Sequence, residues 1–98
     1  MEHFNNLTPK EDELLALLME ECGEVIQVIG KIMRHGLESW HPTDDALVSN
    51  RSLLELEIGH VIAAYERLHD ASIVRTTVVE SSRARKHLTV EKWLHHQE

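Results

Sequence analysis

The chain has 98 residues with 17 acidic and 10 basic side chains, which give a formal net charge of −7. This excess of carboxylates argues against nucleic acid or an anionic membrane surface as the main partner. No apolar run approaches the roughly 18 residues that a membrane-spanning helix needs. The length suits one small domain with a modest core, so we expect a single domain over residues 1–98.

The sequence favours a cytoplasmic location. The N-terminal stretch "MEHFNNLTPK" lacks the basic and then apolar pattern of a secretory signal. Cys22 is the only cysteine and therefore has no partner for an internal disulfide.

The stretch "LTPKEDELLALLMEECGEVIQVIGKIMRHG" predicts a long first helix over about residues 9–35. Thr8 and Glu11 form a Thr-x-x-Glu capping box, and Pro9 suits the first helical position. Gly36 can take the left-handed conformation that ends a helix. Apolar residues recur at steps of three and four and form one stripe: Leu14, Leu18, Cys22, Val25, Ile29, Ile32 and Met33.

Two further helices are predicted after a loop that contains Pro42 and Thr43. The second runs over about residues 51–69, with Ser49 or Asn50 as its cap. The third runs over about residues 72–94, although its many β-branched residues also favour strands and a break near Thr89 is an alternative.

These patterns predict an all-α fold, a bundle of three main helices per chain. A first helix about 40 Å long needs partners along its whole length, and one short chain supplies few. We therefore expect the bundle to be completed by association into a homo-oligomer, a dimer or a tetramer.

Carboxylates interrupt the apolar part of the first two helices. Glu20, Glu21 and Glu24 lie mid-helix, where the helix dipole does not favour them, and Glu57 and His60 lie one turn apart on the second helix. If the two helices pack antiparallel, four of these side chains could converge, and hard divalent ions such as Mg²⁺ prefer several oxygen ligands. Glutamates are also good helix formers on solvated faces, and the residues alone leave both interpretations open.

The segments "EECGEVIQVIGKIMRHG" and "NRSLLELEIGHVIAA" together resemble the MazG-like branch of the all-α nucleoside triphosphate pyrophosphohydrolases. The family pattern is Glu-Glu-x-x-Glu on one helix and Glu-x-x-Asp on the next. The first half is intact here, whereas His60 stands where the family usually has Asp. The C-terminal "VEKWLHHQ" also resembles small members of the family, and the likeness spans about residues 8–97.

The resemblance implies metal-dependent hydrolysis of a nucleoside triphosphate to the monophosphate and pyrophosphate. Glu21, Glu24, Glu57 and His60 would hold Mg²⁺ or Mn²⁺. Glu20 would be a further ligand or the group that orients the attacking water, which places Glu20, Glu21 and Glu24 at the catalytic centre. Bound cations would reverse the negative sign of the site towards a polyanionic substrate.

Basic residues supply weaker candidates for substrate binding: Lys31, Arg34, Arg51 and Lys86. For each, a solvated charge is at least as good an interpretation. Trp40 could stack on a base, but a packing role is the more common one for such a residue.

Two other functions stay open at this stage. A catalytically silent module for oligomerisation or partner binding would explain His60, because one hard ligand is replaced. An unrelated carboxylate-type metal bundle pairs Glu-x-x-His motifs, and Glu57 with His60 matches one such motif. The first helix has no second Glu-x-x-His at the matching place, which makes this alternative the weaker one.

Overall fold

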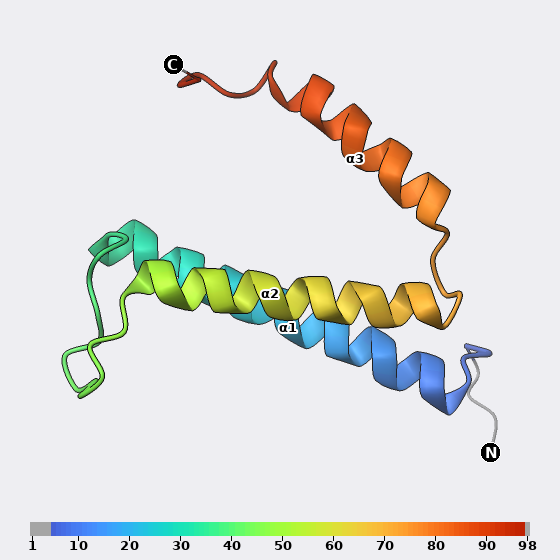
Figure 1. The fold of residues 1–98 in the computed structure, drawn as a ribbon, viewed down its shortest axis with the longest axis horizontal. Coiled ribbons are helices and arrows are strands. Elements are labelled where there is room, and N and C mark those ends of the chain that lie inside the picture. Colours follow the sequence, from blue (N-terminus) through green and yellow to red (C-terminus); the bar gives the residue numbers. More distant parts are fainter. Residues whose placement is uncertain (1–4, 98) are drawn as a thin grey trace.

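The computed structural model describes residues 5–97, and within them it contains three helices and no strand (Figure 1). Helix α1 spans Pro9–His35, α2 spans Asn50–Asp70 and α3 spans Thr76–Val90. The predicted all-α fold is confirmed. None of these helices is long and apolar enough to cross a membrane.

Helix α1 begins at the capping box that the sequence predicts. The Thr8 hydroxyl accepts a hydrogen bond from the Glu11 backbone N–H at 3.1 Å, and the Thr8 N–H donates to the Glu11 carboxylate at 2.8 Å. The helix ends at Gly36, whose φ of 91° lies in the region that favours glycine and whose N–H donates to the Ile32 carbonyl. The helix therefore starts and stops where local chemistry dictates.

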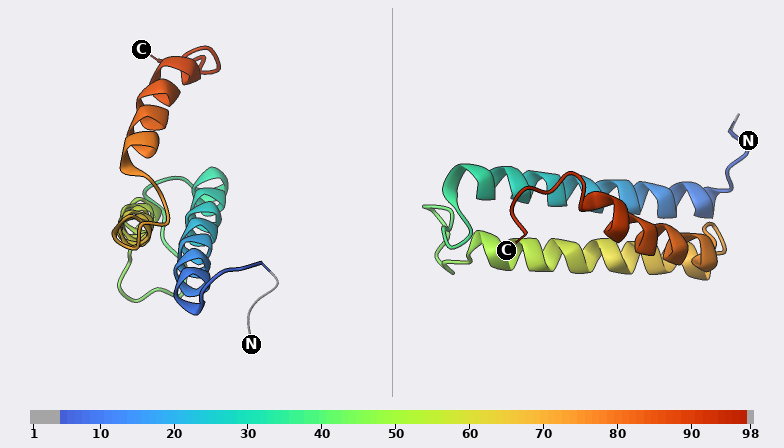
Figure 2. Two further views of the ribbon diagram at one scale, coloured as in Figure 1. Left: turned by 90° about the vertical axis from the view of Figure 1, so that its right-hand side faces the viewer. Right: turned by 90° about the horizontal axis from the view of Figure 1, so that it is seen from above.

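Helices α1 and α2 lie side by side and antiparallel (Figures 1 and 2). Their contact contains the buried apolar side chains of the described chain, which are Val28 of α1 and Ala64 and Leu68 of α2. The core is small because it consists of one helix–helix contact.

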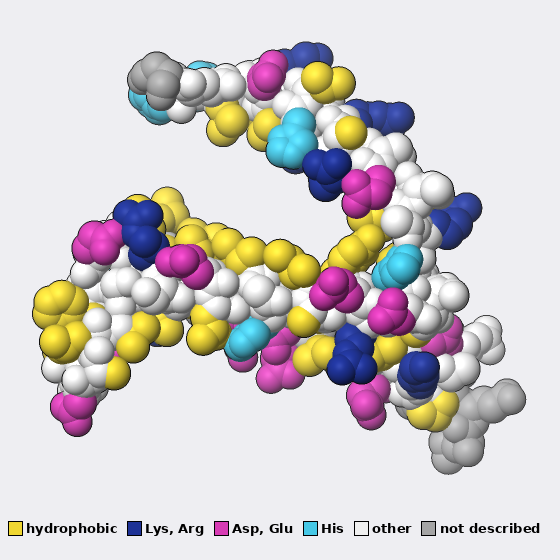
Figure 3. Space-filling view, in the orientation of Figure 1, with side chains coloured by type: hydrophobic (Ala, Val, Ile, Leu, Met, Phe, Trp, Pro, Cys, Tyr) yellow, Lys and Arg dark blue, Asp and Glu magenta, His cyan; other side chains and the backbone are white. Residues whose placement is uncertain are grey.

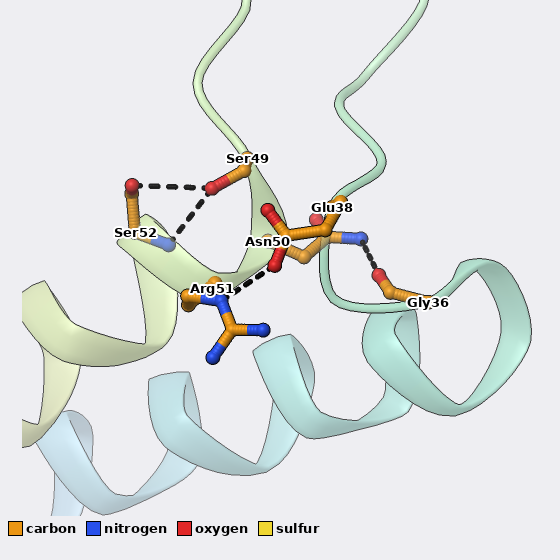
Figure 4. Close-up of polar contacts among 6 residues, drawn as sticks. All are labelled: Gly36, Glu38, Ser49, Asn50, Arg51 and Ser52. Atoms are coloured by element: carbon orange, nitrogen blue, oxygen red, sulfur yellow. Dashed lines mark hydrogen bonds and ion pairs between the residues drawn. The ribbon is translucent and has the colours of Figure 1, made fainter.

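Polar contacts hold the end of α1 against the start of α2 (Figure 4). The buried Asn50 side chain donates to the Gly36 carbonyl at 3.1 Å, and the Arg51 N–H donates to the Leu37 carbonyl. Ser49 caps α2 by accepting from the Ser52 N–H at 3.1 Å. These bonds fix how far α2 is displaced along α1.

Helix α3 starts later and ends earlier than the sequence predicts. Ser72 has a φ of 60° and the Ile73 N–H bonds back to the Leu68 carbonyl, so residues 71–75 form a turn. The helix follows at Thr76 without a side-chain cap on its N-terminus. It leads away from the α1–α2 hairpin and has no buried residue (Figures 1 and 2).

Candidate metal centre

Four potential metal ligands converge midway along the α1–α2 contact. Glu21 and Glu24 are one turn apart on α1, and Glu57 and His60 are one turn apart on α2. Each offers one ligand atom, and these atoms all lie within 4.8 Å of one another. The antiparallel packing thus brings together the four residues that the sequence predicts as metal ligands.

The imidazole of His60 lies between carboxylates of both helices. Its Nδ1 is 3.3 Å from Oε2 of Glu21 and 3.4 Å from Oε2 of Glu57. His60 is half exposed, whereas the side chains of Glu21 and Glu57 are only 16% and 14% exposed. One wall of the cluster is therefore open to solvent and the other is covered by the helices.

Two carboxylate oxygens in the cluster lack hydrogen bonds. Oε2 of Glu21 and Oε2 of Glu57 are buried, and neither has a hydrogen-bond partner among the described residues. A buried acceptor without a partner is costly, and a charged one more so. Both atoms lie within ion-pair distance of His60 Nδ1 but accept no hydrogen bond from the described residues, and a cation held between the two helices would supply the partner that they lack.

The carboxylates also perturb one another. The pKa of Glu57 is raised above its ordinary value of 4.5, first by a side-chain hydrogen bond with Glu24, then by burial and by the negative charge of Glu24. The neighbouring His60 acts in the opposite direction. Part of this rise in the pKa of Glu57 comes from the negative charge of Glu24, which a cation bound between the two carboxylates would offset.

The donor set could hold a divalent metal ion. Three carboxylates supply the oxygen ligands that Mg²⁺ and Mn²⁺ prefer, and the imidazole adds a nitrogen that Mn²⁺ and later transition metals accept more readily than Mg²⁺. The set does not fix which ion binds. Glu20, the remaining acidic candidate, is exposed on α1 and lies outside the group of four.

The basic candidates fall in three different places. Lys31 and Arg34 line a pocket at the loop end of the hairpin. Arg51 pairs with the Glu38 carboxylate (Figure 4). Lys86 lies on α3, which leads away from the hairpin (Figure 1). Of these four candidates, Lys31 and Arg34 share the lining of one cavity among the described residues.

That pocket has a volume of about 380 Å³ and lies between the end of α1, the loop and the start of α2. Trp40 contributes to its lining. The sequence did not predict the other lining residues: His35, Ser39, His41, Pro42, Asp44, Val48, Asn50 and Leu53. For Asn50 a signal existed, because it precedes Glu57 by two helical turns and therefore shares its face.

Loop bonds shape this pocket. The Asp44 carboxylate accepts from the backbone N–H groups of Ala46 and Val48 at 3.0 and 2.9 Å. The Thr43 N–H donates to Nδ1 of His41 at 3.2 Å. Hydrogen bonds within the loop, several of them from backbone N–H groups, therefore help to hold the shape of the pocket.

Comparisons with protein-family models, with characterised proteins and with solved structures find no match to this chain. The all-α fold and the cluster of three glutamates and a histidine are consistent with the MazG-like resemblance, but they do not identify the family.

Proposed function

We propose that this chain is a divalent-metal-dependent pyrophosphohydrolase that cleaves a nucleoside triphosphate to the monophosphate and pyrophosphate. The observation that carries the proposal is the two-helix cluster. Its four ligand atoms lie within 4.8 Å of one another, and two of its buried carboxylate oxygens have no hydrogen-bond partner. The Glu-Glu-x-x-Glu and Glu-x-x-His spacing of the sequence supports the same reaction class through its resemblance to the MazG-like family.

Glu21, Glu24, Glu57 and His60 would hold the metal. A divalent ion bound there supplies positive charge for the phosphate oxygens and favours ionisation of a coordinated water. The side chains contribute the geometry: the two helices fix the carboxylates before substrate arrives, so little reorganisation is needed.

Glu20 is the candidate for holding the attacking water. It precedes Glu21, is exposed, and is free of the group of four ligands, so its carboxylate can accept a hydrogen bond from a water at the rim of the cluster. As a general base it would take one proton from that water as the oxygen attacks phosphorus.

The pocket at the loop end is the candidate for positioning the rest of the nucleotide. Lys31 follows Glu24 by seven residues, which is two turns and about 10 Å along the same face. A nucleotide bound at the cluster can reach that distance. Lys31 and Arg34 would then meet phosphate oxygens, and Trp40 offers an aromatic surface.

Pyrophosphate release tests the proposal directly. A panel of ribo- and deoxyribonucleoside triphosphates is incubated with the protein and Mg²⁺ or Mn²⁺. We expect release from at least one nucleotide, and a loss of at least 100-fold in Glu24→Ala and in Glu57→Ala. Glu55→Ala is the matched control, because Glu55 is an exposed carboxylate of α2 outside the cluster, and it should keep wild-type activity.

Pyrophosphate release, measured together with metal binding, distinguishes the enzyme from a catalytically silent module. The substitution of His60 for the Asp of the family pattern is the feature that favours the silent module. Metal binding in calorimetry together with no pyrophosphate release from any nucleotide would support the silent module and contradict the proposed hydrolase.

A further inference from the structure

The pocket at the loop end has the size and lining of a site for a planar ring. Its volume of about 380 Å³ is within the range of small-molecule sites. Trp40 lines it and is 47% exposed, so a ligand can reach the indole. Val48 and Leu53, both partly buried, add apolar contacts. Figure 3 shows exposed hydrophobic side chains at this end of the hairpin, on the left, with charged side chains near them.

The pocket lies two helical turns from the metal cluster on both helices. Lys31 follows Glu24 by seven residues, and Asn50 precedes Glu57 by seven. Seven residues of a helix span about 10 Å. When the phosphates of a nucleotide are held at the cluster, its base is the part that lies furthest from the metal. The pocket is in the right place for that base.

His41 offers a hydrogen-bond donor to this pocket. Its Nδ1 accepts from the Thr43 backbone N–H at 3.2 Å, and the Thr43 hydroxyl lies 2.8 Å from the same atom. A backbone N–H can only donate, so Nδ1 carries a lone pair and the neutral ring has its proton on Nε2. The Nε2–H group is therefore the one that His41, a lining residue, has free to donate to a ligand.

Asp44 offers two acceptors in a fixed orientation. Its Oδ1 accepts from the Ala46 N–H at 3.0 Å and its Oδ2 from the Val48 N–H at 2.9 Å. One backbone bond to each oxygen limits rotation of the carboxylate and leaves a lone pair on each oxygen for a ligand. The Asp44 N–H donates to the His41 carbonyl at 2.9 Å, so the two lining residues belong to one turn. This turn thus supplies one donor and two acceptors.

We propose that the pocket binds the base of the substrate and selects guanine. One edge of guanine carries O6, N1–H and the N2 amino group, which are an acceptor and two donors in a row. The Nε2–H of His41 donates to O6, the two oxygens of Asp44 accept from N1–H and the amino group, and Trp40 stacks on the ring. This inference rests on the proposed function, because it names the base of the triphosphate that is cleaved.

The other bases match one donor and two acceptors less well. Adenine and cytosine have a ring nitrogen with a lone pair beside the amino group, so one oxygen of the carboxylate would face that lone pair. Uracil and thymine have a single N–H between two carbonyl oxygens, and one of these would face the carboxylate. An acceptor opposite an acceptor loses a hydrogen bond and adds repulsion, and selectivity follows from this mismatch.

Fluorescence titration with nucleoside monophosphates tests the pocket without any hydrolysis. Trp93→Phe leaves Trp40 as the single tryptophan of the full chain, and Trp93 is 76% exposed and outside the pocket lining. In chelator, we expect guanosine monophosphate to quench Trp40 and to bind roughly tenfold or more tightly than the adenosine, cytidine and uridine monophosphates. Inosine monophosphate lacks only the N2 amino group and should also bind roughly tenfold more weakly.

A matched pair of variants assigns the selectivity to one carboxylate. Asp44→Asn should bring the ratio of guanosine to inosine monophosphate affinity close to one. Asp45→Asn should keep the ratio, because Asp45 is an exposed neighbour that does not line the pocket.

The comparison of ligands is decisive even if Asp44→Asn disturbs the loop. Equal binding of the guanosine and inosine monophosphates, tighter binding of another base, or no quenching would each overturn the proposal. Selective binding of guanosine monophosphate without pyrophosphate release from guanosine triphosphate would support the base site and contradict the hydrolase. Pyrophosphate release with the same kcat/KM for every nucleotide would contradict the base site and leave the hydrolase standing.

Discussion

His60 is the residue at which the cluster departs from a set of four carboxylates. Its Nδ1 lies 3.3 and 3.4 Å from carboxylate oxygens of α1 and α2, so a carboxylate at this position would face the same centre. Imidazole favours Mn²⁺ and later transition metals over Mg²⁺. The identity of this one ligand should therefore set the order of metal preference.

We expect His60→Asp to shift the ratio of Mn²⁺ to Mg²⁺ affinity towards Mg²⁺ by roughly tenfold or more. Isothermal titration calorimetry with each metal measures the ratio without requiring activity. His69→Asp is the control, since His69 is an exposed histidine of α2 outside the cluster. An unchanged ratio in His60→Asp would show that His60 is not a ligand.

Glu57 makes the stability of the metal-free protein depend on pH. Its raised pKa means that the folded chain binds this proton more tightly than the unfolded chain does. A charged Glu57 therefore destabilises the fold at neutral pH, and this penalty disappears as pH falls through the folded pKa towards the unfolded value of about 4.5.

We expect Glu57→Gln to raise the Tm of the metal-free protein at about pH 7 and to lose this advantage as pH approaches 4.5. Scanning calorimetry of both proteins in chelator measures the difference at each pH. The same variant should bind metal more weakly, so the order of Tm values should reverse when metal is added. A Tm difference that does not vary with pH would contradict the assignment.

Residue spacing predicted the cluster but not the pocket. Glu21, Glu24, Glu57 and His60 lie on helices, where a three-residue step fixes a shared face before any tertiary contact is known. The lining around His41 depends on how Asp44 accepts two backbone N–H groups and on how Asn50 reaches Gly36. These loop contacts depend on the tertiary fold, and no regular spacing of residues in the sequence predicts them.

At the scale of the elements, the hairpin depends on the join between α1 and α2. Asn50 is the only buried polar side chain among the described residues, and its amide donates to the Gly36 carbonyl at the end of α1. The backbone N–H of Asn50 also donates to the Ser39 carbonyl. The Asn50 side chain thus links the start of α2 to the end of α1, and it also forms part of the pocket lining.

We expect Asn50→Asp to lower the free energy of unfolding by about 1–3 kcal/mol, because a carboxylate of the same shape cannot donate to the Gly36 carbonyl. Urea unfolding followed by circular dichroism measures the change. Ser52→Ala should alter it by less than about 0.5 kcal/mol, because the capping bond from the Ser52 backbone N–H to Ser49 remains and only the exposed bond that the Ser52 hydroxyl accepts from Ser49 is lost. Equal stability of Asn50→Asp and wild type would contradict a structural role for the amide.

The ends of α1 are marked by particular residues of the sequence, whereas the start of α3 is not. Thr8, Glu11 and Gly36 are residues whose own chemistry starts or stops a helix, and α1 has the bounds 9–35 that they indicate. The start of α3 is set instead by the positive φ of Ser72 and by the bond from Ile73 to Leu68. No side chain caps α3, so the sequence offered no marker for its first residue.

At the scale of the molecule, the cluster links the two elements that form the core. Two of its ligands come from α1 and two from α2, and α1 with α2 makes the main tertiary contact of the described chain. The buried core of Val28, Ala64 and Leu68 is small, so the binding free energy of one metal ion at the cluster would be a large fraction of the stability of the hairpin.

We therefore expect Mn²⁺ to raise the Tm of the whole protein and a chelator to reverse the rise. A ligand that binds only the folded state stabilises it by about 2.7 kcal/mol at a concentration 100 times its Kd. Scanning calorimetry across a metal titration should give a Tm that keeps rising with the logarithm of metal concentration. Glu24→Ala should abolish the rise and Glu55→Ala should keep it, because only Glu24 belongs to the cluster. A rise of equal size in both variants would mean that the metal acts elsewhere on an acidic surface, and the two-helix centre would then be excluded as the source of the stabilisation.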